Sequence, residues 1–193
     1  MYQDLYFDEV VLIAQKIDRV KVSSLVDEIV NLRENKGRLF FIGIGGSAGN
    51  TSHAVNDFRK LCGIESYSLT DNVSEFTARV NDEGWETVFT NILEVSNPTS
   101  RDGIFVLSVG GGNEEKEISI NIVNVIKYAK NKNLKVFGIV GKSDGYAAQH
   151  GDLVVIIPEI DSKRTTPHSE SFQSVVWHCV VTDPKLQTNP TKW

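Results

Sequence analysis

The sequence has little cysteine, and the cysteines it has are widely separated. Cys62 and Cys179 lie far apart and form no C-x-x-C motif. The sequence therefore offers no short cysteine signature for a metal or redox site. We expect both residues to be small buried hydrophobic side chains.

Long apolar runs and basic runs are also missing. No apolar stretch is long enough to span a bilayer, so no membrane association is expected. The first residues, Met1 to Asp4, are polar and acidic and do not resemble a signal peptide, which makes the cytoplasm the expected location. The net charge is −5 and no cluster of lysine or arginine forms a basic stripe, so no nucleic-acid partner is expected. This mild acidity still permits a locally positive phosphate pocket.

Short apolar runs alternate with helical patterns along the chain. Such runs fit strands buried on both faces of a parallel sheet, and the alternation predicts an α/β fold with helices on both sides. The 193 residues suit one domain, expected to span 1–193. We expect the polar tail after Pro184 to be loosely held. The expected strands are 38–43, 66–69, 104–108, 135–140 and 153–158, and the expected helices are 48–61, 114–132 and 168–181.

The N-terminal region has apolar positions spaced among charged ones. From about residue 5 to 35 this spacing predicts one long or two short amphipathic helices. Gly37 marks their end.

A glycine-rich turn, Gly43-Ile44-Gly45-Gly46-Ser47-Ala48, follows the first strand and opens a helix. Glycines let the backbone approach an anion, and the N–H groups of a helix N-terminus supply donors and a favourable dipole. Ser47 adds a hydroxyl. The same residues match the dinucleotide fingerprint G-x-G-x-x-A, with Glu65 and Asp71 near the distance expected for a ribose ligand. A tight turn without a ligand is a third interpretation.

A second turn, Ser108-Val109-Gly110-Gly111-Gly112-Asn113, also follows a strand and precedes a helical pattern. Ligands of parallel sheets bind beyond the carboxyl ends of the strands. Two such turns can hold two ends of one phosphorylated substrate, or two edges of one phosphate site. The GK[ST] ending of a P-loop is absent, so nucleotide hydrolysis is not supported.

Histidines and carboxylates on two predicted helices form a candidate reactive set. His53 and Asp57 are four residues apart and share one helical face. Glu170 and His178 are eight apart on the last helix and can share a broad face. Together they can close a zinc-type site or act as an acid/base set for proton transfer. Both interpretations require the two helices to meet, which the sequence does not prove.

Several motifs occur in a characteristic order over nearly the whole chain. They are Gly43-x-Gly45-Gly46-Ser47, His53 with Asp57, Asn81-Asp82-x-Gly84, Ser108 with its glycine turn, and Gly141-Lys142-Ser143-Asp144-Gly145. This ordered set resembles the phosphoheptose isomerase branch of the SIS (sugar isomerase) family.

The resemblance implies a flavodoxin-like parallel sheet sandwiched between helices. It also implies a homotetramer with active sites between subunits, and we expect the helices of about 5–35 to contribute to the oligomer interface. The implied reaction converts sedoheptulose 7-phosphate to a heptose 7-phosphate through an enediol. The residues carried over are Ser47, Asp82 and Ser108 as substrate contacts; His53, Asp57, Glu170 and His178 as positions that hold zinc in some members; and Asp57 with His178 as the proton-transfer pair. Gly45, Gly46, Gly110, Gly111, Gly112 and Asn113 are added as substrate-binding residues of the turns.

The chain departs from the family pattern in ways that affect the substrate site. Ile44 stands where asparagine is usual, Asp57 replaces glutamate and Glu170 replaces glutamine. The 108–113 turn replaces a loop rich in serine and threonine, which shifts phosphate binding toward backbone N–H groups and Ser108. These changes keep a non-catalytic sugar-phosphate-binding or regulatory SIS module open as one alternative. A small nucleotide-binding oxidoreductase is another.

Overall fold

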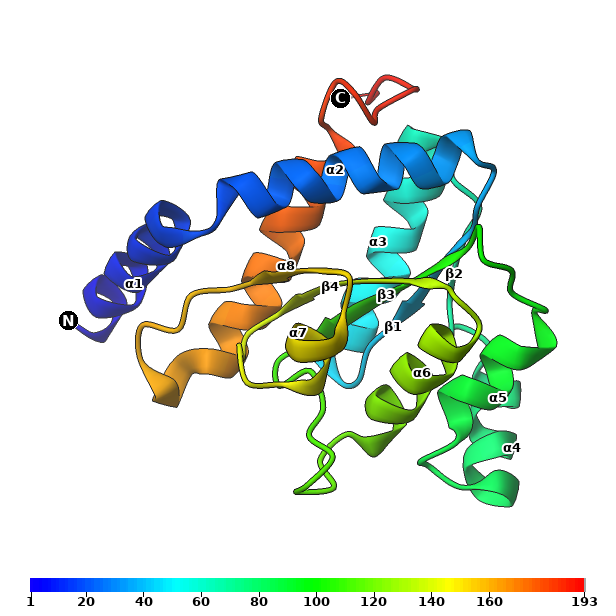
Figure 1. Cartoon of the computed structure of the whole chain (residues 1–193). Helices are drawn as coiled ribbons and strands as arrows, with labels where there is room; N and C mark the ends of the chain where they lie inside the picture. Colours follow the sequence, from blue (N-terminus) through cyan, green and yellow to red (C-terminus); the bar gives the residue numbers. More distant parts are fainter. Residues whose placement is uncertain (193) are drawn as a thin grey trace.

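A five-stranded parallel sheet forms the centre of the computed structural model, which describes residues 1–192 (Figure 1). The strand order is β2-β1-β3-β4-β5, and every neighbouring pair is parallel. The predicted α/β class is therefore confirmed. The strands are β1 Leu39–Ile42, β2 Ser66–Ser68, β3 Gly103–Ser108, β4 Lys135–Val140 and β5 Leu153–Ile156.

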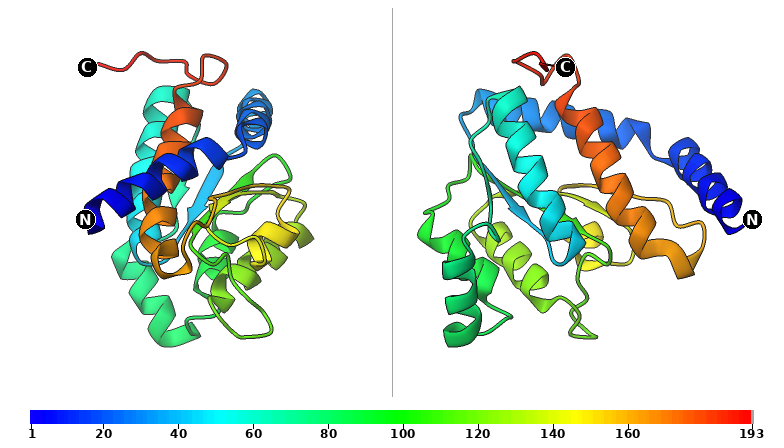
Figure 2. Two further views of the ribbon diagram at one scale, coloured as in Figure 1. Left: turned by 90° about the vertical axis from the view of Figure 1, so that its left-hand side faces the viewer. Right: turned by 180° about the vertical axis from the view of Figure 1, so that it is seen from behind.

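Helices cover both faces of this sheet (Figures 1 and 2). Helices α2, α3 and α8 bury one core with the strands, and α5, α6 and α7 help to bury the other. The helices are α1 Tyr2–Lys16, α2 Arg19–Glu34, α3 Gly46–Cys62, α4 Val73–Glu83, α5 Val88–Val95, α6 Ile120–Asn131, α7 Tyr146–His150 and α8 Thr165–Val181, with a 3₁₀ turn at Ser162–Arg164.

Alternation along the strands explains why their sequences are continuously apolar. In β1, Phe41 faces the α3/α8 side, whereas Phe40 faces the α5/α6 side. Phe41 stacks on Phe105 of β3 with ring centroids 4.9 Å apart. A strand buried on both faces leaves no position for a polar side chain.

The N-terminal region forms two helices that meet at Asp18, whose side chain accepts a hydrogen bond from the Lys21 N–H at 2.9 Å. Helix α2 packs on the molecule, while α1 projects away from the sheet (Figure 1). No helix within residues 1–192 is long and apolar enough to cross a membrane.

Two sequence-based expectations about the path of the chain are wrong. Residues 114–119 are not helical, because Asn113 and Ile118 form an antiparallel bridge and Glu117 and Ser119 have positive φ values of 52° and 49°. This acidic segment has few apolar side chains to bury as a helix. The tail is held as far as Asn189: Leu186 is fully buried, and the Asn189 N–H donates to the Leu61 carbonyl.

The two cysteines differ in environment. Cys62 is buried, and this burial raises the pKa of its thiol to about 12. Cys179 is exposed on α8, so the expectation of burial is wrong for this residue. Its position on the outer side of the helix explains the difference.

Candidate functional site

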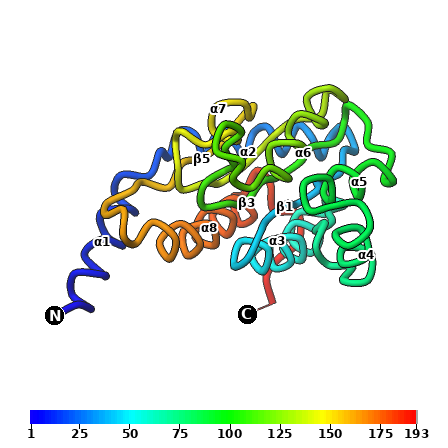
Figure 3. Tube along the Cα trace, turned by 90° about the horizontal axis from the view of Figure 1, so that it is seen from below, coloured from blue at the N-terminus to red at the C-terminus, as the bar shows by residue number. Residues whose placement is uncertain are grey.

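Helices α3 and α8 lie side by side on one face of the sheet (Figures 2 and 3). Helix α3 starts immediately after β1, at the carboxyl edge of the sheet. Both helices bury apolar side chains in the same core, which includes Phe58 from α3 and Trp177 from α8. This packing brings α3 and α8 together, which both interpretations of the histidine and carboxylate set require.

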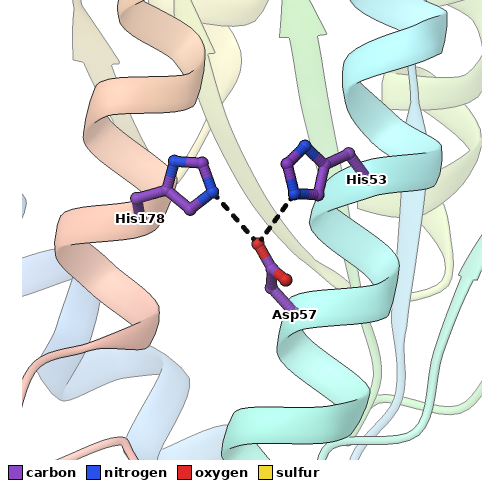
Figure 4. Close-up of side chains that lie close together, drawn as sticks. All are labelled: His53, Asp57 and His178. Carbon is purple, nitrogen blue, oxygen red and sulfur yellow. Dashed lines mark ion pairs between the residues drawn. The ribbon is translucent and has the colours of Figure 1, made fainter. Parts of the chain in front are cut away.

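A carboxylate between two imidazoles forms the centre of the α3/α8 contact (Figure 4). Asp57 Oδ2 lies 3.5 Å from His53 Nε2 and 3.3 Å from His178 Nε2. The Asp57 residue is buried, whereas the side chains of His53 and His178 are 55% and 47% exposed. The two rings therefore stand between the buried carboxylate and solvent.

Two neighbouring side chains orient the Asp57 carboxylate. Trp177 Nε1 donates to Oδ2 at 3.2 Å, and Asn56 Nδ2 donates to Oδ1 at 3.1 Å. The indole also lies beside both imidazoles, with ring centroids 5.4 Å from His53 and 5.1 Å from His178. Sequence reasoning missed Trp177, although its place next to His178 was a usable signal.

The geometry of His53, Asp57 and His178 fits a divalent metal ion. One ligand atom from each lies within 4.8 Å of the other two. Zinc bonds of about 2.1 Å in a tetrahedron place ligand atoms roughly 3.4 Å apart. The two nitrogen–oxygen distances in the cluster, 3.5 and 3.3 Å, match this value. Three protein ligands with an open side are typical of catalytic rather than structural zinc sites.

Glu170 lies elsewhere, at the N-terminus of α3. Its carboxylate accepts a hydrogen bond from the Ser47 N–H at 3.1 Å and is not part of the three-residue cluster. Eight residues along a helix correspond to an advance of about 12 Å, which separates Glu170 from His178 although both lie on α8. The predicted four-ligand set is therefore not assembled within this chain.

The second glycine turn has the backbone conformation that its sequence indicates. Gly111 and Gly112 have φ values of 73° and 83°, and the Gly111 N–H donates to Ser108 Oγ at 3.0 Å. Because Ser108 accepts in this bond, its own O–H remains a donor for a ligand oxygen. The Asn113 side chain turns back into the 113–118 hairpin, where it accepts a hydrogen bond from the Lys116 N–H.

Two further candidate residues differ in accessibility. Ser47 is 1% exposed, and its Oγ accepts a hydrogen bond from Gln173 Nε2 at 3.1 Å. Asp82 is exposed near the end of α4 and accepts a hydrogen bond from Asn81. Asp82 therefore lies on a different element from both glycine turns and from the His53–Asp57–His178 cluster.

Comparison with known proteins finds similarity to phosphoheptose isomerases. The phosphoheptose isomerase of Roseiflexus sp. is 27% identical over 148 residues, which cover 74% of this chain and 72% of that protein. The structure of phosphoheptose isomerase GmhA from Neisseria gonorrhoeae matches with a TM-score of 0.79 and 19% identity, and the match covers 93% of this chain and 96% of that one. The chain is similar to phosphoheptose isomerases in sequence, and it shares their fold.

The lincomycin biosynthesis protein LmbN of Streptomyces lincolnensis is 32% identical over 157 residues, or 77% of this chain. The match spans only 56% of LmbN, so the chain corresponds to little more than half of that protein. No protein-family model matches the chain. The structural likeness confirms the SIS-type sheet expected from the sequence.

Proposed function

We propose that the chain is an aldose–ketose isomerase that converts sedoheptulose 7-phosphate to a heptose 7-phosphate. The observation that carries the proposal is the Asp57 carboxylate held between two half-exposed imidazoles, in a chain that resembles phosphoheptose isomerases. A carboxylate and a histidine are sufficient to move a proton between adjacent carbons.

The proposed chemistry uses Asp57 and His178 as the proton-transfer pair. A base removes the proton from the carbon next to the carbonyl, which gives a cis-enediol. An acid then returns a proton to the neighbouring carbon, while a second exchange moves a proton between the oxygens. His53 lies 3.5 Å from the same carboxylate oxygen and is placed to stabilise the negative charge of the ionised carboxylate.

The distance between the glycine turn and the cluster favours a long substrate. At about 1.5 Å per residue, His53 lies roughly 9 Å and Asp57 roughly 15 Å along α3 from Ser47. With bonds of about 1.5 Å, an extended seven-carbon sugar places its carbonyl carbon roughly 9 Å from phosphorus, against roughly 4 Å for a three-carbon sugar. A sugar phosphate that reaches from the glycine turns at the carboxyl edge of the sheet to the imidazoles therefore needs a long carbon chain.

A divalent metal, most naturally zinc, is proposed at His53, Asp57 and His178; with the ion bound, these residues would serve as its ligands, and the free oxygen of Asp57 or a bound water would be the base. When bound there, such an ion acts as a Lewis acid toward the sugar carbonyl and hydroxyl. Elemental analysis of the purified chain before and after chelation tests this, with Asp57→Asn as the variant expected to lose metal. Less than about a tenth of an equivalent in the native chain supports a metal-free acid/base cluster instead.

We also propose a homo-oligomer, with a tetramer as the expected form. Helix α1 projects from the molecule and exposes Leu5, Phe7 and Val11, which are 48%, 65% and 53% exposed. Burial of these side chains against another copy removes apolar surface from water. The cytoplasm remains the predicted location of the protein.

The deciding experiment is proton exchange on candidate substrates. The chain is incubated in D₂O with sedoheptulose 7-phosphate and with shorter ketose phosphates, and NMR follows deuterium at the carbon next to the carbonyl. The proposal expects incorporation that is fastest for the heptulose. If no sugar phosphate exchanges above background, the isomerase function is rejected and a binding module remains.

A further inference from the structure

Helix α1 is anchored to the rest of the chain at two buried residues, Glu9 and Ile13. Ile13 packs in the core that α3 and α8 share, whereas Glu9 is a carboxylate that is only 3% exposed. A buried carboxylate needs charged or hydrogen-bonding partners, because its loss of water is otherwise not compensated. The partners of Glu9 stand at the start of α8, 155 and 159 residues further along the chain.

The Glu9 carboxylate makes a bidentate pair with a guanidinium and a hydrogen bond with an imidazole. Arg164 Nε donates to Oε2 at 2.8 Å, and Arg164 Nη2 donates to Oε1 at 2.6 Å. His168 Nε2 lies 2.8 Å from Oε2, and Tyr6 of α1 stacks on the same imidazole with ring centroids 4.5 Å apart. A bidentate pair fixes direction as well as distance. Glu9 therefore holds the start of α8 in one orientation.

The start of α8 also contacts the loop that follows β4. The Ser169 hydroxyl lies against Gly141, where an added Cβ atom would be only 2.0 Å from Oγ. Glu159, which precedes α8, accepts hydrogen bonds from the Thr165 hydroxyl and from Lys142 Nζ. The loop is therefore fixed to the start of α8 at two points.

This loop in turn holds the second glycine turn through backbone hydrogen bonds. The Gly141 N–H donates to the Val109 carbonyl at 2.9 Å, and the Tyr146 N–H donates to the Gly112 carbonyl at 2.8 Å. A displacement of the loop after β4 therefore moves the second glycine turn with it.

The first glycine turn is fixed to the same end of α8. Glu170 stands two residues after His168, and its carboxylate accepts a hydrogen bond from the Ser47 N–H at 3.1 Å. Successive residues of α8 thus contact three parts of the chain: His168 contacts α1, Ser169 the loop after β4, and Glu170 the first glycine turn. A rigid helix transmits a change at one of these contacts to the other two.

We propose that Glu9 is a positioning residue for the substrate site and acts through the start of α8 on both glycine turns. Helix α1, which we also place in the oligomer interface, then holds the two turns in place. The His53–Asp57–His178 cluster has no part in this set of contacts, so Glu9 should affect substrate binding and leave proton transfer unchanged. The effect on substrate rests on the proposed function, which assigns both turns to a sugar phosphate.

The backbone amide resonances of Ser47 and Gly111 report on the two glycine turns without any substrate. Glu9→Ala removes all three bonds, and Ile13→Val is the control because it trims the other anchor of α1 and keeps the Glu9 bonds. Both resonances should shift in Glu9→Ala and stay at their native positions in Ile13→Val. Glu9→Gln, which keeps one acceptor oxygen, replaces the alanine variant if thermal unfolding shows that the latter does not fold. Native resonance positions in a folded Glu9 variant would overturn the proposal.

Deuterium exchange on sedoheptulose 7-phosphate tests the effect on substrate binding. Glu9→Ala should raise KM by about 2–30-fold, the range for residues that act through packed elements. It should leave kcat unchanged, since a loss of binding shared by ground and transition states appears in KM alone. A native KM, or a fall in kcat alone, would contradict the positioning role. If the native chain exchanges no sugar phosphate, the proposed function fails, whereas the amide shifts still decide whether Glu9 holds the turns.

Discussion

Replacement of Trp177 by phenylalanine should weaken the site while leaving its imidazoles and carboxylate in place. In the native chain the indole N–H donates to Asp57 Oδ2 at 3.2 Å. Phenylalanine keeps an aromatic ring in the core but has no donor. The Asp57 carboxylate then loses the bond that holds Oδ2 toward the two imidazoles.

Two independent magnitudes agree for this change. A hydrogen bond to a charged group contributes about 1.5–3 kcal/mol. Groups that orient a metal-binding or catalytic ligand affect affinity or activity by about 10–100-fold when they are removed. Since about 1.4 kcal/mol corresponds to a factor of ten, both lead to the same range. We expect kcat/KM for deuterium exchange to fall by about 10–100-fold.

Stability must be separated from site geometry in this test, because Trp177 is fully buried. Val176→Ala is the matched control, since Val176 is 2% exposed on the same helix and packs in the same core. Its lost methyl groups destabilise the fold by roughly 1–3 kcal/mol. Only Trp177→Phe should slow exchange at a temperature where both variants are folded. Equal rates for Trp177→Phe and the native chain would refute the role of the indole.

Three further outcomes follow from the same structure. Asp57→Asn should lower the exchange rate by about 10²–10⁴-fold, whereas Cys179→Ser, an exposed change next to His178, should leave the NMR rate unchanged; comparable rates in both variants would contradict the assignment of Asp57. The bonds from Arg164 and His168 hold the pKa of Glu9 at about 2, below its ordinary 4.5. Their stabilisation is therefore complete above about pH 4.5 and lost as the pH falls toward 2. In urea unfolding, the free energy of unfolding of Glu9→Gln should fall less between about pH 4.5 and 2 than that of the native chain. An unchanged pH profile would count against the contribution of the Glu9 bonds to Arg164 and His168. Phe7→Glu should reduce the particle mass by light scattering toward 21.5 kDa; an unaltered mass would remove α1 from the oligomer interface.

The strands could be predicted from sequence because burial on both faces of the sheet produces a continuous run of apolar residues. Continuous apolar runs such as 104–108 need no knowledge of the partner strand. Helix α4 gave no comparable signal, because it buries none of its residues completely. The 113–118 hairpin was mistaken for helix, since its bridge between Asn113 and Ile118 depends on backbone geometry rather than on hydrophobic spacing.

The candidate site was predictable to the extent that it is local. The four-residue spacing of His53 and Asp57 predicts their shared face, and they do approach each other. The partnership with His178 depends on the packing of α3 against α8, which spacing within one helix cannot supply. A shared helical face did not bring Glu170 and His178 together, because two side chains on one face can still lie at different heights along the helix.

The glycine turn before α3 shows that a sequence motif can identify open N–H donors without identifying the anion that binds them. Gly45 and Gly46 leave the first N–H groups of the helix open to an anion, and this much follows from the local sequence. Which anion arrives depends on a residue 123 positions later, Glu170, whose carboxylate bonds the Ser47 N–H. An external phosphate and an internal carboxylate satisfy the same donors. At the second turn, the Gly111 N–H instead donates to the neutral hydroxyl of Ser108.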